Sequence, residues 1–119
     1  MDERPVAIIR TFPFVFFRER TPLQFAREWY TLNRDDVTWI CPMNRLPKIE
    51  VPYVYIVALN RLRYRVNLVE FEQGGEREFE DGRRYAANHW MVMAGPVVKA
   101  PYRIEMRGFQ GFRYSGFIF

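Results

Sequence analysis

The segment RLRYRVNLVEF, residues 61–71, places three arginines at alternate positions of an expected β-strand. Side chains at alternate positions of a strand share one face and stand about 7 Å apart. That spacing is close to the phosphate repeat of an extended single nucleic-acid strand, so Arg61, Arg63 and Arg65 form a row suited to a phosphate backbone. The alternative is that this face is the solvated side of an antiparallel sheet, with arginines paired to acids such as Glu70.

Aromatic rings near such cations would add a surface on which nucleic-acid bases stack. In the C-terminal stretch, Arg113 and Tyr114 are adjacent and extend this combination to a second strand. Trp39 and Trp90 are the indoles that we expect to remain for stacking, although burial in the core is the common fate of tryptophan. The candidate ligand-binding residues are therefore Trp39, Arg61, Arg63, Arg65, Trp90, Arg113 and Tyr114.

Residues for covalent or metal-assisted catalysis are scarce. The chain has one histidine, His89, and one cysteine, Cys41, so one chain assembles neither a Cys/His zinc set nor an internal disulfide. Most acids fall in a glycine-rich stretch that we expect to be solvated rather than arranged for acid–base work. The C-terminal glycines lack the lysine and the following helix of a phosphate-binding loop. We therefore predict no catalytic residue, no metal and no cofactor.

The composition indicates a folded, soluble chain. Its 119 residues are close to the usual size of one domain, so we expect residues 1–119 to form a single domain, and the 18% of aromatic residues favours a sheet-based core. No apolar run approaches the roughly 18 residues that a membrane span needs, and the acidic start does not resemble a signal peptide. We expect a cytoplasmic protein without a membrane partner.

The net charge of +4 is unevenly distributed along the chain. Residues 66–86 contain three arginines and six acids, which sum to −3 and leave both flanking stretches positive. Such segregation is typical of a basic face with an acidic rim, as nucleic-acid binders often have.

Periodicity predicts the elements that position these residues. An apolar run predicts a strand near residues 5–11, and the capping-box pattern of Thr21 and Gln24 predicts a helix that ends near Asn33. Three prolines in residues 41–52 predict a loop. The helix has a wide apolar face, so we expect it to lie against a sheet.

The strongest pattern is a hairpin over about residues 51–72, with a tight turn at Asn60 and Arg61. The acidic stretch that follows predicts an exposed excursion with a turn at Asp81 and Gly82. Beyond it we expect a short strand HWMVM, a loop GPVVKAP, a strand YRIEM and a glycine-spaced curved terminal strand. The predicted fold class is α+β: a small, curved, mostly antiparallel β-barrel of six or seven short strands, with one main helix packed on it.

Three segments, PYVYIVALNRLRYRVNLVEF, DGRRY with HWM, and GFQGFRYSG, resemble the later part of PUA-like proteins, which include EVE and ASCH domains and small archaeal relatives. The resemblance spans residues 50–117. It implies a small curved β-barrel that recognises RNA or modified DNA bases in a pocket lined by aromatic rings. The chain lacks the glycine-lysine-x-x-glutamate-x-arginine signature of ASCH domains and the tryptophan-rich start of EVE domains, so the site residues are taken from this chain alone.

We therefore expect a non-enzymatic module that binds RNA or DNA, including DNA with a modified base, in an aromatic pocket flanked by arginines. Salt-dependent binding would follow, because neutralised phosphates release counterions. The oligomeric state is not predicted.

Two alternatives remain open. The first is a small enzyme acting on a nucleotide or a nucleotide derivative through His89 with Glu105 or Glu50. The second is a protein–protein interaction module in which the final FIF pairs as an edge strand.

Overall fold

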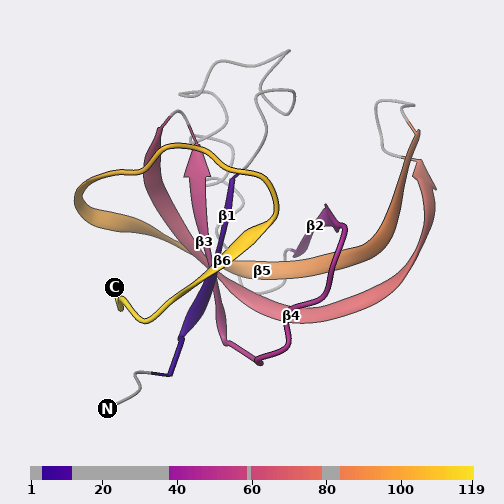
Figure 1. Cartoon of the computed structure of the whole chain (residues 1–119), viewed down its shortest axis with the longest axis horizontal. Coiled ribbons are helices and arrows are strands. Elements are labelled where there is room, and N and C mark those ends of the chain that lie inside the picture. The colour runs from indigo at the N-terminus through magenta and orange to yellow at the C-terminus, as the bar shows by residue number, and fades with distance from the viewer. Residues whose placement is uncertain (1–3, 12–37, 59, 79–83) are drawn as a thin grey trace.

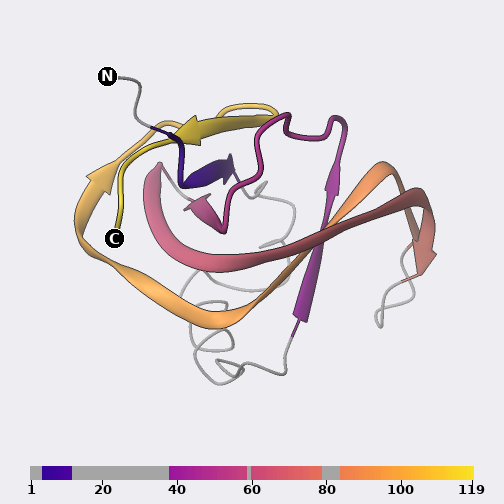
Figure 2. The same cartoon turned by 90° about the horizontal axis from the view of Figure 1, so that it is seen from below.

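The described part of the chain forms one curled sheet. The computed structural model describes residues 4–11, 38–58, 60–78 and 84–119. Six strands lie in the order β2-β5-β4-β3-β1-β6 and bend into an open half-barrel (Figure 1, Figure 2). They are β1 (Ala7–Thr11), β2 (Thr38–Met43), β3 (Tyr53–Ala58), β4 (Arg61–Glu78), β5 (Arg84–Glu105) and β6 (Phe112–Ser115).

This architecture corrects part of the predicted fold class. The sheet is open, because β2 and β6 lie at its two edges, so the expected closure into a barrel is not seen among the described residues. That part of the chain is all β, and the predicted helix between Thr21 and Asn33 lies outside it. The same residues contain no helix that is long and apolar enough to cross a membrane.

The pairing is mixed but mostly antiparallel, as predicted. β1 runs parallel to β3, whereas the other four pairings are antiparallel. β1 confirms the strand predicted near residues 5–11. Its apolar residues and those of β3 are continuous rather than alternating, because both strands are buried on both faces.

Two clusters of apolar side chains cover these two faces. The first contains residues from all five strands from β1 through β5, with Ile8, Ile56 and Met93 among its members. The second lies on the opposite face, where Ile9 and Tyr55 meet residues near the C-terminus such as Phe119. The C-terminal segment therefore completes the apolar cluster on this second face of the sheet.

The predicted hairpin is confirmed as β3 and β4, with Tyr53 opposite Asn67 and Ala58 opposite Arg61. The turn falls one residue earlier than predicted, because Arg61 already belongs to β4. Asn60 has a φ of 59°, a left-handed conformation that asparagine tolerates better than most residues.

The prediction of separate short strands after the hairpin is wrong, since β4 has 18 residues and β5 has 22. The acidic excursion is the far end of this β4–β5 ribbon, and its predicted turn at Asp81 and Gly82 lies outside the described residues. The expected loop GPVVKAP is strand as well. Its prolines fit because both fall where the β4–β5 register shifts, so no ladder hydrogen bond needs their missing N–H.

The loop predicted at residues 41–52 begins later than expected. Cys41, Pro42 and Met43 belong to β2, which pairs only with β5 and is an edge strand. Proline is tolerated on an edge strand, where its lack of an N–H leaves no neighbouring strand unpaired.

Candidate functional site

A bulge in β4 separates Arg63 from both neighbouring strands. Leu62 and Tyr64 pair with consecutive residues of β3, so Arg63 is the extra residue between them and has no partner in that register. It has no partner in the β4–β5 register either. A bulge of this kind redirects a side chain, and the Nε of Arg63 donates a hydrogen bond to the carbonyl oxygen of Ala58 at 2.6 Å.

The neighbouring strand arches away at the same place. Leu62 pairs with Ile104 and Tyr64 pairs with Lys99, so four residues of β5, 100–103, lie opposite the single residue Arg63. Pro101 lies within this arch, where it cannot donate a ladder hydrogen bond. The mismatch in length opens a space between the two strands.

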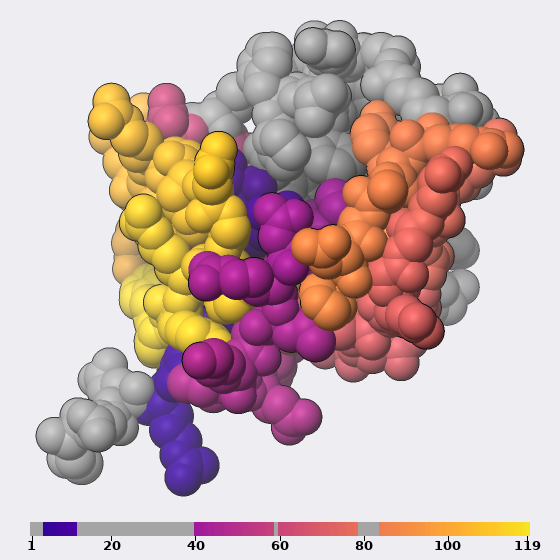
Figure 3. Space-filling model, turned by 45° about the vertical axis from the view of Figure 1, so that its right-hand side comes forward, coloured from indigo at the N-terminus to yellow at the C-terminus, as the bar shows by residue number. Residues whose placement is uncertain are grey.

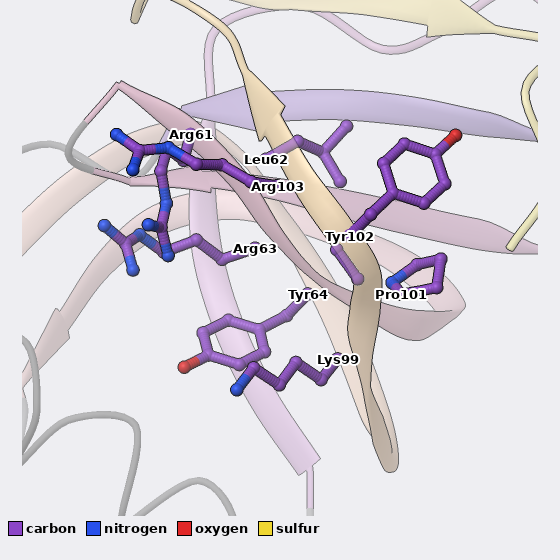
Figure 4. A pocket seen from close by; sticks show the side chains of 9 residues that line it. Arg61, Leu62, Arg63, Tyr64, Lys99, Pro101, Tyr102 and Arg103 are labelled. Carbon is purple, nitrogen blue, oxygen red and sulfur yellow. The ribbon is translucent and has the colours of Figure 1, made fainter.

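We call this space the cationic hollow. It has a volume of about 230 Å³ and lies between β4 and β5 (Figure 4). The residues that line it are Arg61, Leu62, Arg63, Tyr64, Lys99, Ala100, Pro101, Tyr102 and Arg103. Among these residues, four carry a positive charge and none carries a negative one.

The charge of the hollow is only partly compensated. Arg103 forms an ion pair with Glu105 at 3.1 Å, but the two side chains are 67% and 73% exposed, so solvent screens the pair. Within the described part of the chain, neither Arg61 nor Lys99 has an ion-pair partner.

The pKa of Arg63 reflects this crowding. Burial lowers the pKa of its guanidinium from the ordinary value, and the neighbouring charges of Arg61 and Arg103 lower it further. The group stays protonated at neutral pH, because a guanidinium is not deprotonated in proteins. Like charges held together in this way favour the binding of an anion.

Arg65 takes a different direction from its two neighbours in the predicted row. Its guanidinium carbon lies 4.6 Å from the ring centre of Tyr53 and 5.9 Å from that of Phe119. The Phe119 ring in turn stacks on Tyr55 with 4.8 Å between ring centres. The predicted row is therefore divided. Arg61 and Arg63 line the hollow, whereas Arg65 contacts the rings of Tyr53 and Phe119, the last residue of the chain.

Neither of the two tryptophans that were predicted to bind a ligand, Trp39 and Trp90, is among the residues that line the hollow. Trp90 is 1% exposed, and its indole N–H donates to the carbonyl oxygen of Gly75 at 3.1 Å. An indole buried to this extent would have to be uncovered before a base could stack on it. Trp39 pairs with Met93 in the β2–β5 register, and its side chain lies outside the described part of the structure.

The predicted residues of the tail lie on the edge strand β6, away from the lining of the hollow. The guanidinium carbon of Arg113 lies 4.1 Å from the ring centre of Phe109. The Tyr114 hydroxyl accepts hydrogen bonds from the backbone amides of Lys48 and Ile49, at 2.8 and 3.1 Å. Figure 3 shows the C-terminal residues, in yellow, beside this magenta segment between β2 and β3. Tyr114 thus joins two segments of the fold.

The sequence analysis did not identify three charged or exposed aromatic residues that line the hollow: Lys99, Tyr102 and Arg103. Tyr102 is 58% exposed, and its ring meets that of Phe117 edge to face at 6.1 Å. In Figure 4 the Tyr102 ring lies on the opposite side of β5 from the three guanidinium groups. Pro101 was the available signal, since a proline between two strand-like segments indicates a break in pairing.

The residues of the enzyme alternative are spread over two segments of the chain. His89 and Glu105 both lie on β5, from position 89 to position 105, which at about 3.3 Å per residue is about 50 Å of curved strand. Glu50 is exposed in the segment between β2 and β3. In the described ranges, no group of three or more His, Cys, Asp or Glu residues is arranged to hold a metal ion.

The final FIF does not form the expected edge strand. β6 ends at Ser115, and residues 117–119 fold back over the sheet. There the hydroxyl of Tyr55 donates a hydrogen bond to the carbonyl oxygen of Phe117. Ile118 is 68% exposed, so this segment anchors itself through its two phenylalanines.

No protein family, curated protein or solved structure matches the chain.

Proposed function

We propose that this protein is a non-enzymatic nucleic-acid-binding module of PUA-like type, and that it holds a phosphate of a single strand in the cationic hollow. The observation that carries the proposal is the convergence of Arg61, Arg63, Lys99 and Arg103 around one space. Among the described residues, the ion pair of Arg103 with the exposed Glu105 is the one ion pair that these four cations form. Arginine forks and lysine ammonium groups are the usual protein partners of phosphate.

The rings beside the hollow support a single-stranded ligand. Tyr102 is the exposed ring among the residues that line the hollow, and the 41% exposed Phe117 lies next to it. Bases of a single strand are free to stack on such rings, whereas bases inside a duplex are not. The proposed site therefore combines a phosphate position on one side of β5 with a stacking position on the other.

The curled, mostly antiparallel sheet is compatible with the PUA-like assignment. The pocket in this proposal differs from the one expected from the sequence, because tyrosine and phenylalanine rather than tryptophan flank the cations. RNA and DNA are both candidate ligands, since phosphate contacts do not distinguish them.

Fluorescence anisotropy with labelled single-stranded RNA and DNA at about 50 and 200 mM salt tests the proposal. The double variant Arg61→Gln/Arg103→Gln should bind more weakly. Its plot of log affinity against log salt should be shallower by roughly 1.4, which is about 0.7 for each lost contact with a single strand.

Arg84→Gln is the control for the loss of positive charge: it removes one charge, against two in the double variant, from the acidic end of the β4–β5 ribbon, where Arg84 pairs with Glu76 at 3.4 Å. That end lies on the opposite side of the molecule from the hollow (Figure 1). Equal losses in the double variant and in this control, or no binding by the wild type at low salt, would refute the proposal.

A further inference from the structure

We propose that the cationic hollow selects the phosphate monoester at the end of a nucleic-acid strand over the phosphodiesters within the strand. This inference rests on the proposed function and specifies its ligand. The row of arginines expected from the sequence does not predict this selectivity, because such a row would follow the phosphate backbone of a strand rather than bind the phosphate at its end.

A site that follows a backbone needs cations spaced about one phosphate repeat apart, roughly 7 Å for alternate strand positions. Here the row is broken, because Arg65 turns to Tyr53 and Phe119. In Figure 4 the guanidinium groups of Arg61, Arg63 and Arg103 lie on the same side of β5. Cations gathered around one space suit one densely charged group.

A phosphate monoester carries about −1.5 to −2 at pH 7 and has three terminal oxygens that accept hydrogen bonds. A phosphodiester within a strand carries one negative charge. Burial and the charges of Arg61 and Arg103 lower the pKa of the Arg63 guanidinium. A ligand with a second negative charge therefore relieves more of the repulsion among these three arginines.

Each guanidinium has five N–H donors, and the Arg63 Nε–H is already bonded to the carbonyl oxygen of Ala58. Within the described part of the chain, its two terminal nitrogens make no other hydrogen bond and can donate to a ligand. Lys99 lines the hollow from β5, opposite Tyr64 in the β4–β5 register. Lysine and arginine donors thus approach the space from different directions, as three terminal oxygens require.

The hollow has a volume of about 230 Å³, below the roughly 300–1,000 Å³ of pockets that enclose drug-sized molecules. A water molecule takes about 30 Å³ of liquid volume. The space therefore accommodates a phosphate group with a few waters, while the base stays outside, where Tyr102 is exposed.

The test compares single strands of one sequence that differ only at their ends: a 5′-phosphate, a 3′-phosphate, or hydroxyl groups at both ends. One of the two phosphorylated strands should bind at least about tenfold more tightly than the hydroxyl-ended strand, a factor typical of one charge-assisted hydrogen bond. Arg63→Gln should reduce this preference to less than about twofold. Arg84→Gln should leave it intact, which excludes a general effect of ligand charge.

Arg61→Gln is a second test variant that leaves the Arg63–Ala58 hydrogen bond in place, and thermal unfolding scans identify any variant that fails to fold. Equal binding of all three strands by the wild type would overturn the inference while leaving the proposed function in place. No binding of any strand would overturn the proposed function itself. Competition by a mononucleotide at the same concentration as the phosphorylated strand would overturn the assignment to a strand end.

Discussion

Arg65 should matter for stability and not for nucleic-acid binding, although it belongs to the same predicted row as Arg61 and Arg63. Replacing it with glutamine removes the cation from the rings of Tyr53 and Phe119, 4.6 and 5.9 Å away. A cation–π contact contributes about 0.5–1 kcal/mol at exposed sites and about 2 kcal/mol when desolvated. Arg65 is half-buried, so we expect a loss of about 1–2 kcal/mol, or about 4–8 °C in Tm for a domain of this size.

The assay combines urea unfolding with the salt dependence of oligonucleotide binding. Arg65→Gln should lower the free energy of unfolding and leave the salt slope unchanged. Arg61→Gln should do the opposite, because it removes one of several like charges around the hollow and breaks no ion pair within the described part of the chain. A double-mutant cycle of Arg65→Gln with Phe119→Ala should give a coupling of about 0.5–1 kcal/mol. A normal stability for Arg65→Gln together with a shallower salt slope would refute this division of roles.

Three further predictions follow from other parts of the fold. Burial raises the pKa of the Cys41 thiol, so the folded state keeps its proton where the unfolded state loses it, and stability should fall as pH rises above about 8.5. Urea unfolding from pH 7 to 10 should show a smaller fall for Cys41→Ala, and an equal fall would contradict this. A Cβ at Gly74 would overlap the backbone of β5, so Gly74→Ala should cost about 1–3 kcal/mol in urea unfolding, and a neutral result would contradict that packing. Tyr114→Phe removes the acceptor for the amides of Lys48 and Ile49, so their hydrogen exchange should become roughly five- to tenfold faster, whereas unchanged rates would show that the hydroxyl does not hold this segment.

The parts of the fold that were predictable depend on local patterns. β1 and the β3–β4 hairpin follow from continuous or alternating apolar residues and from a turn residue, Asn60, that tolerates a left-handed conformation. β5 was divided incorrectly because Pro96 and Pro101 suggested breaks. Both prolines interrupt the pairing with β4, but β5 continues past them. Whether a proline ends a strand depends on how the partner strand pairs around it, and the sequence of β5 alone does not contain that information.

The candidate site was only half predictable for a related reason. Alternation placed Arg61 and Arg63 on one face, but the bulge that turns Arg63 toward Ala58 is a property of two pairings at once. Lys99 joins these arginines only because β5 arches at the same position. Arg65 left the row because the distant C-terminus supplies Phe119, a contact that no local pattern encodes.

Side-chain NMR of the arginine Nε–H groups tests most directly whether the hollow receives a phosphate. Adding an end-phosphorylated single strand should shift the signals of Arg61, Arg63 and Arg103, while that of Arg84 stays in place. Shifts at Arg84 of equal size, or unchanged signals at all three arginines of the hollow while the strand is bound, would contradict the account.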